Sequence, residues 1–149
     1  MRNFFPFLFL LSCYLSLFQI NLSQAQENPE AKKLKKVVKK ILSLCEKASD
    51  KKLAPYVIYR LNDPQRKWKD AYQANNPEEL GRVTRLRKYI QENYLIYDKY
   101  SFVKYQEEIE SEGKWQVWEL HFEGGDRADK KTFFAFLKIK GRFVLGDID

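Results

Sequence analysis

Two segments of the chain carry apolar residues at steps of three and four, which is the spacing of one face of an α-helix. The first runs from residue 30 to residue 48 and predicts a helix roughly 28 Å long. Its apolar positions are Ala31, Leu34, Val37, Val38, Ile41, Leu44, Cys45 and Ala48. The second helix is expected to begin after Asn76, because an asparagine cap, Pro77 in the first turn and the carboxylates of Glu78 and Glu79 all favour a helix N-terminus. Its apolar stripe is Leu80, Val83, Leu86, Ile90 and Tyr94.

Beyond Tyr97 the hydrophobic period changes from that of a helix to that of a strand. Four strand candidates follow at residues 101–110, 115–123, 131–140 and 142–148. The short connections between them favour an antiparallel meander. Because the helices precede the strands, we expect an α+β fold in which helices pack on one face of a curved antiparallel sheet, a cone-like roll.

The segment between the two helices is less regular. Residues 53–60 are rich in β-branched and aromatic side chains and include Pro55, which predicts a short edge strand. Asn62 and Pro64 favour a turn, and residues 65–76 are consistent with one or two irregular helical turns.

The turns decide which side chains share a face of the sheet. If Glu112 and Gly113 form the first turn, Val103 and Tyr105 lie on the core face, with Tyr105 opposite Leu120. If Lys140 and Gly141 form the last turn, one face carries Phe134, Phe136, Lys138, Phe143, Leu145 and Asp147. The other face then carries Phe133, Ala135, Leu137, Ile139, Val144, Gly146 and Ile148.

The last hairpin is therefore apolar on both sides, and one layer of helices cannot cover both. Phe134, Phe136, Phe143 and Leu145 need a further cover, which the interior of the cone, a small-molecule pocket or a dimer interface would provide. This face, together with Asp147, is the candidate surface for an apolar ligand or for a partner such as a second copy of the chain.

The N-terminal residues have the layout of a secretory signal peptide. An apolar run from residue 4 to residue 20 follows Arg2 and ends before the small-residue site Ser23-Gln24-Ala25. We expect cleavage after Ala25, which leaves one domain at residues 26–149, exported to the periplasm or secreted and without stable membrane insertion. An uncleaved anchor and lipidation at Cys13 remain alternatives. Removal of the signal leaves Cys45 as a lone cysteine, which cannot form an intramolecular disulfide.

The composition is basic, with 27 Lys and Arg against 20 Asp and Glu and a formal charge of +7. A hydrophobic content of 44% excludes both a multi-pass membrane protein and a disordered chain. Part of the basic charge forms one stripe on the first helix, at Lys32, Lys33, Lys35, Lys36, Lys39 and Lys40. This stripe is either a solvated face or a surface that attaches to an anionic partner. No aromatic residue is interleaved to stack on bases, so nucleic acid is not an expected partner.

Catalytic and metal-binding motifs are missing from the sequence. The only histidine, His121, falls on a polar strand face, and the loop that follows lacks the ligand spacing of a calcium site, so neither a metal nor a cofactor is expected. The one candidate set for proton transfer is Asp147 as base, desolvated by the apolar face, with Tyr56 or Tyr59 as donor. The alternative is that Asp147 belongs to a solvated chain end.

The layout of residues 30–149, with the strand pair joined at Gly141-Arg142-Phe143, resembles the nuclear-transport-factor-2-like, cystatin-like α+β cone and small exported bacterial proteins of that kind. The resemblance implies a cone-shaped sheet but no single function, because such folds include transport adaptors, isomerases, dehydratases, cyclases and accessory domains without chemistry. We therefore expect an exported non-enzymatic domain that binds a small apolar ligand or a protein partner. The alternatives are an isomerase-like or cyclase-like enzyme and attachment to an anionic surface through the basic helix.

Overall fold

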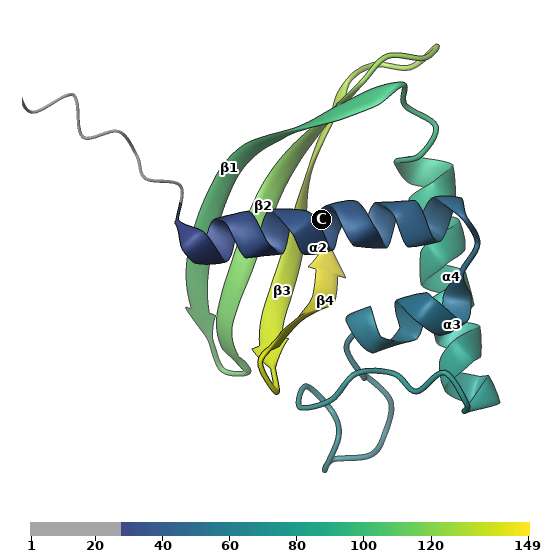
Figure 1. The fold of residues 1–149 in the computed structure, drawn as a ribbon, viewed down its shortest axis with the longest axis vertical. Helices are drawn as coiled ribbons and strands as arrows, with labels where there is room; N and C mark the ends of the chain where they lie inside the picture. The colour runs from purple at the N-terminus through teal and green to yellow at the C-terminus, as the bar shows by residue number, and fades with distance from the viewer. Residues whose placement is uncertain (1–27) are drawn as a thin grey trace, which may run out of the picture. The chain divides into compact units, whose positions relative to one another are not determined.

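A computed structural model describes residues 28–149, so the expected signal peptide and its cleavage site lie outside the described residues. The chain divides into two units, Met1–Lys32 and Lys33–Asp149, and the sheet and the site discussed below belong to the second. The elements are α2 (Pro29–Glu46), α3 (Asp50–Leu53), the 3-10 turn η1 (Ala54–Tyr56), α4 (Pro77–Asn93), β1 (Lys99–Glu110), β2 (Gly113–Glu123), β3 (Lys130–Ile139) and β4 (Arg142–Ile148). The predicted α+β class is confirmed (Figure 1).

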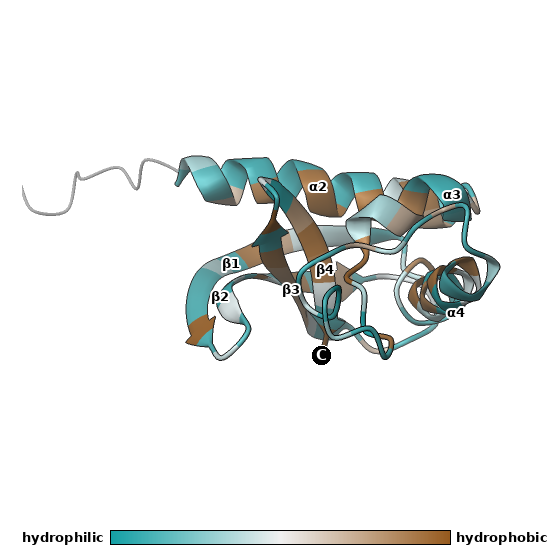
Figure 2. Ribbon diagram, turned by 90° about the horizontal axis from the view of Figure 1, so that it is seen from below, coloured by the Kyte–Doolittle hydropathy of each residue, from teal (hydrophilic) through white to brown (hydrophobic). Residues whose placement is uncertain are grey.

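Helix α2 crosses one face of the sheet, which Figures 1 and 2 show from two directions. The predicted stripe is buried at Leu34, Val38, Ile41 and Cys45. The helix ends at Glu46, two residues earlier than expected, because Ala48 adopts a left-handed backbone with φ of 51°. The Ser49 N–H then donates to the Leu44 carbonyl at 2.9 Å, and the Ala48 N–H donates to the Cys45 carbonyl at 3.1 Å, which is the hydrogen-bond pattern of a Schellman C-terminus.

Helix α4 begins as the sequence predicts. The Asn76 side chain accepts hydrogen bonds from the backbone N–H groups of Glu78 and Glu79, at 3.0 and 3.3 Å. The helix lies on the β4 side of the sheet (Figure 1). The Gln91 side chain donates to the Cys45 carbonyl at 2.8 Å and so ties α4 to α2.

The sheet is an open antiparallel meander with the strand order β1-β2-β3-β4, as expected. The last turn is confirmed at Lys140 and Gly141, which have φ values of 48° and 78°. The first turn differs, because it lies at residues 111–112 and not at residues 112–113. Tyr105 is therefore opposite Trp118 and not Leu120, a slip of two residues that leaves its face unchanged.

A register shift in β1 makes one core assignment wrong. Phe102 is opposite Leu120 and Lys104 is opposite Glu119, so Val103 is an extra residue in a β-bulge. Phe102 takes the inward position and stacks edge-on against Trp118, with 5.1 Å between ring centroids. Val103, which was expected on the core face, is 49% exposed.

A second bulge, at Gly146 in β4, makes the expected position of Asp147 wrong as well. Phe136 is opposite Leu145, but the neighbouring Ala135 is opposite Asp147, so Gly146 is the extra residue. The bulge moves Asp147 away from the face of Phe134, Phe136 and Leu145, where it was expected, and places Ile148 opposite Phe134.

The predicted edge strand at residues 53–60 is also wrong. Leu53 ends α3, and Pro55 lies in the first positions of η1, where its missing N–H breaks no hydrogen bond. The extended backbone is limited to Val57 and Ile58, which form isolated bridges to Leu145 and Ala71. The α-helical and 3-10 turns at this point override the β propensity of the side chains.

The chain itself covers both faces of the last hairpin. Phe134, Phe136, Phe143 and Leu145 are at most 6% exposed, on the face crossed by α2. A second cluster occupies the opposite face, at Ile58, Trp115, Val117, Leu137 and Val144. Trp68 and Ala71, from the segment between η1 and α4, pack against that cluster. The irregular segment thus supplies the cover that one layer of helices could not.

Gly146→Ala tests the close packing at the β4 bulge. A Cβ atom at residue 146 would overlap the ring of Trp115, which is itself buried against Trp68. We expect a loss of about 1–3 kcal/mol in the free energy of unfolding, measured by urea denaturation. Gly81→Ala in α4 is the control, because nothing lies within 4 Å of its added Cβ, and it should stabilise the protein by about 0.5–1 kcal/mol. Equal effects of the two substitutions would contradict this account of the bulge.

Candidate ligand-binding pocket

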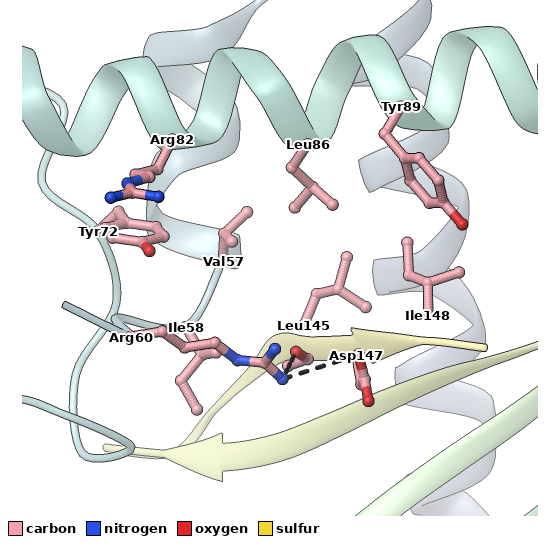
Figure 3. A pocket seen from close by; sticks show the side chains of 11 residues that line it. Val57, Ile58, Arg60, Tyr72, Arg82, Leu86, Tyr89, Leu145, Asp147 and Ile148 are labelled. Atoms are coloured by element: carbon pink, nitrogen blue, oxygen red, sulfur yellow. Dashed lines mark hydrogen bonds and ion pairs between the residues drawn. The ribbon is translucent and has the colours of Figure 1, made fainter.

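A cavity of about 280 Å³ lies between α4 and β4, here called the α4–β4 pocket. Figure 3 shows Leu86 projecting from α4 toward Leu145 of β4, with Ile148 and Val57 beside them. These side chains and Ile58 give the pocket apolar walls. The volume is slightly below the ~300 Å³ at which small-molecule sites generally begin, which suits a small ligand.

Arg60 and Asp147 lie together on the β4 side of this pocket (Figure 3). The Arg60 guanidinium donates to the Gly146 carbonyl and forms an ion pair with Asp147, with 3.8 Å between Nη2 and Oδ1. Its Cζ also lies 4.6 Å from the centre of the Trp68 ring. The Arg60 guanidinium thus interacts with Asp147 and the Gly146 carbonyl on one side and with the Trp68 ring on the other.

Arg82 stands at one end of the pocket, near Tyr72 (Figure 3). Its side chain is exposed and forms no ion pair with any residue in the described range 28–149. Burial raises the pKa of Tyr72, an effect that the charges of Arg60 and Arg82 only partly offset. At neutral pH this end of the pocket therefore has one unpaired cation and one neutral phenol.

Tyr89, at the other end of the pocket, is also held in its neutral form. A hydrogen bond with Tyr94, at 3.4 Å between the two hydroxyl oxygens, raises the pKa of Tyr89, and burial acts in the same direction. Tyr94 in turn is within 3.2 Å of the Thr132 hydroxyl. This chain of hydroxyl groups connects the pocket to the core face of β3.

A buried ion pair fixes the segment that carries Arg60 and Tyr72. Glu79, in the first turn of α4, is only 1% exposed and accepts two hydrogen bonds from Arg66, at 2.6 and 3.0 Å. The backbone N–H of Gln73 and the amide of Asn76 also donate to this carboxylate, at 2.6 and 3.1 Å. The Arg66 hydrogen bonds lower the pKa of Glu79, so the carboxylate is charged at neutral pH.

Glu79→Gln tests this ion pair. The substitution removes the buried charge that Arg66 holds through two hydrogen bonds and leaves Asp70, 3.3 Å from Arg66 Nε, as its ion-pair partner, so we expect a loss of about 1–3 kcal/mol in the free energy of unfolding at pH 7. A carboxylate with a lowered pKa stabilises the fold above its unfolded pKa of ~4.3 and stops doing so as the pH falls below its folded pKa. The difference between wild type and variant, measured by urea unfolding, should therefore shrink at acidic pH.

Glu78→Gln is the matched control for this prediction. Glu78 lies in the same turn but is exposed, so its loss removes only a screened interaction with the helix dipole, worth less than about 1 kcal/mol. If the two variants had equal stability at every pH, the ion pair would not have the role assigned to it.

The structure separates the residues proposed for proton transfer. Asp147 lines the α4–β4 pocket, and its side chain is 51% exposed. Tyr56 lines another hollow, beside Lys40 and Lys52, whereas Tyr59 lines a third with Asn62. Of the expected apolar ligand face, Leu145 lines the pocket, and Phe134, Phe136 and Phe143 are covered inside the fold.

The basic stripe lies on α2 as expected from the helical period. Lys32, Lys33, Lys36, Lys39 and Lys40 are exposed, and Lys35 is half-buried, with its ammonium 5.0 Å from the centre of the Phe102 ring. Burial raises the pKa of the Cys45 thiol to about 12, so it is protonated at neutral pH and is a poor nucleophile.

One group of side chains could supply ligands to a metal ion. Donor atoms of His121, Glu123 and Asp129 lie within 4.8 Å of one another, although the sequence predicts no metal site here. His121 pairs with Asp129 at 3.6 Å, and Glu123 pairs with Lys99 at 3.5 Å. Glu123 thus has a cationic partner without a metal, and His121 and Asp129 form an ion pair when the imidazole is protonated.

Most of the residues that line the pocket carry no motif that marks them as site residues in the sequence. Arg60, Tyr72, Arg82 and Tyr89 are among them. A weak signal existed, because Arg82, Leu86 and Tyr89 are spaced as one face of a helix, four and three residues apart. The apolar stripe of α4 that includes Leu86 is therefore flanked by the polar side chains of Arg82 and Tyr89.

No protein-family model, curated protein or solved structure matches the chain. The similarity to nuclear-transport-factor-2-like cones therefore stays a prediction. Among residues 28–149, no helix has the length and apolar character needed to cross a bilayer.

Proposed function

We propose that this protein is a non-enzymatic binding domain whose α4–β4 pocket takes a small, mainly apolar ligand. The observation that carries the proposal is a cavity with apolar walls and an unpaired arginine at one end. Export to the periplasm or the exterior, inferred from the N-terminal sequence, places the proposed ligand outside the cytoplasm. The expected resemblance to nuclear-transport-factor-2-like cones allows such a role but does not select it, because such folds include both enzymes and domains without chemistry.

The chemistry of the walls favours an amphipathic anion as the ligand. Leu86, Leu145 and Ile148 offer a surface to an apolar body, whose transfer from water is favourable by about 25 cal/mol for each Å² buried. Arg82, which has no carboxylate partner in the described part of the chain, suits an acidic head group at the end of that body. A small apolar carboxylic acid meets both requirements.

The enzymatic alternative has less support. A general base needs a substrate proton within hydrogen-bond reach, with an electrophilic donor nearby. Asp147 is paired with Arg60, and neither Tyr56 nor Tyr59 is among the residues lining the α4–β4 pocket. Binding through the apolar face of the last hairpin also has less support, because Phe134 and Phe136 are buried inside the fold.

Calorimetric titration with decanoate tests the proposed pocket. We expect saturable 1:1 binding that Leu86→Trp weakens at least about tenfold, because the larger side chain fills the cavity; this corresponds to ~1.4 kcal/mol. Ile109→Trp is the matched control, since Ile109 is 88% exposed on β1 and does not line the pocket. Binding that survives Leu86→Trp, in a variant whose circular dichroism is unchanged, would contradict the proposal.

The role of Arg82 is tested by comparing two ligands of equal chain length. Arg82→Gln should weaken decanoate about three- to tenfold at low salt, a modest factor because solvent screens the exposed guanidinium. Binding of the uncharged 1-decanol should change less than about twofold, since it makes no charge interaction with Arg82. Arg85→Gln removes an exposed arginine of the same helix and should affect neither ligand. An equal loss for both ligands in Arg82→Gln would refute charge recognition by this arginine.

A further inference from the structure

A second hollow lies beside the C-terminal end of α2 and the 3-10 turn η1. It shares no lining residue with the α4–β4 pocket. Its volume is about 550 Å³, and it is lined by the side chains of Lys40, Ser43, Leu44, Lys47, Ser49, Lys52 and Tyr56. We call it the lysine hollow. Ser43 lies three residues after Lys40, and Lys47 lies four residues after Ser43, so the basic stripe of α2 continues into the hollow.

Three lysines line this hollow, and no carboxylate is among its lining residues. Within the described part of the chain, Lys40, Lys47 and Lys52 form no ion pair. Of the two acidic side chains on this segment, Asp50 is held by Arg87 at 2.5 Å and by the Thr84 hydroxyl at 2.7 Å, and Glu46 is not among the residues that line the hollow. Within the described residues, no ion pair therefore offsets the charge of the three lysines.

Neutral polar groups complete the lining. The hydroxyl groups of Ser43 and Tyr56 can each donate a hydrogen bond to an anion, whereas the Ser49 hydroxyl donates to the Lys47 carbonyl at 3.5 Å. Lys40 is also held in place by the Tyr56 ring, whose centre lies 5.8 Å from its ammonium nitrogen. Several cations with hydroxyl donors between them form the type of environment in which lysines bind phosphate as point charges.

We propose that the lysine hollow binds a phosphate group. A compact dianion bridges ammonium groups that a monovalent counter-ion would neutralise only singly, which favours phosphate over chloride or a single carboxylate. The group belongs either to a soluble phosphate compound or to the head group of an anionic lipid. This proposal is independent of the α4–β4 pocket, with which the hollow shares no lining residue.

Titration with pyrophosphate at low salt is the first test. The wild-type protein should bind pyrophosphate saturably, one per chain, and Lys40→Gln/Lys47→Gln/Lys52→Gln should bind it at least about tenfold more weakly. The matched control, Lys67→Gln/Lys69→Gln/Lys88→Gln, removes the same charge from exposed lysines outside the hollow and should change the affinity less than about twofold. An equal loss in both triple variants, or no saturation up to about 10 mM, would overturn the proposal.

A second variant tests the proposal independently if the triple variant fails to fold. Ser43→Glu places one carboxylate in the hollow and leaves all three lysines intact, so it should weaken pyrophosphate binding while the circular dichroism stays that of wild type. Unchanged pyrophosphate binding in a folded Ser43→Glu variant would also overturn the proposal.

Vesicles distinguish the two sources of phosphate. If the natural source is a lipid, phosphatidylglycerol vesicles should bind the wild type more tightly than phosphatidylcholine vesicles, and pyrophosphate should compete with them. If the source is soluble, pyrophosphate should bind in the hollow and the lysine substitutions there should leave vesicle binding unchanged. Vesicle binding without any pyrophosphate binding in solution would count against a phosphate site and favour diffuse attraction to the basic stripe.

Discussion

The Arg66–Glu79 ion pair is the constraint on which the arrangement of the described fold depends. It joins the irregular segment between η1 and α4 to the first turn of α4, and it does so with a carboxylate that is 1% exposed. That segment has little regular secondary structure of its own to fix its path. With the ion pair in place, Trp68 can cover one face of the sheet, and Arg60 and Tyr72 reach the α4–β4 pocket.

Two β-bulges decide which side chains of β1 and β4 lie on the core face of the sheet. The bulge at Val103 brings Phe102 onto the core face, and the bulge at Gly146 moves Asp147 off it. Without the second bulge, a carboxylate would lie beside Phe134 and Phe136, where desolvation of its charge would be costly. The two-sided hydrophobicity of the last hairpin is then satisfied by α2 on one face and by the segment of Trp68 on the other.

Much of the fold could be predicted from the sequence, because long periodic segments and strong caps carry the signal. The start of α4 follows from Asn76 and Pro77, and the meander follows from four alternating segments with short turns. The bulges could not be predicted, because they depend on tertiary packing. The Trp115 ring, for example, lies too close to residue 146 for a side chain larger than that of glycine. The edge strand was mispredicted because local propensity does not include packing against α2 and α4.

The candidate site was far less predictable than the fold. Arg82 and Leu86 form a pocket wall only because β4 lies opposite them, and nothing near them in the sequence announces that neighbour. Glu79 was correctly assigned to a helix N-terminus, but its main partner, Arg66, is 13 residues earlier in a segment without periodicity. Pairings of this kind are set by the path of the loop, which no local pattern specifies.

Arg60 interacts with side chains on both sides of the sheet. One guanidinium touches the pocket through Asp147 and lies against the indole of Trp68, which packs on the opposite side of the sheet. If the ligand proposed for the α4–β4 pocket displaced this guanidinium, the contact with the ring would weaken and the emission of Trp68 would change. Trp68 would then act as an optical reporter of the pocket from the opposite face of the sheet.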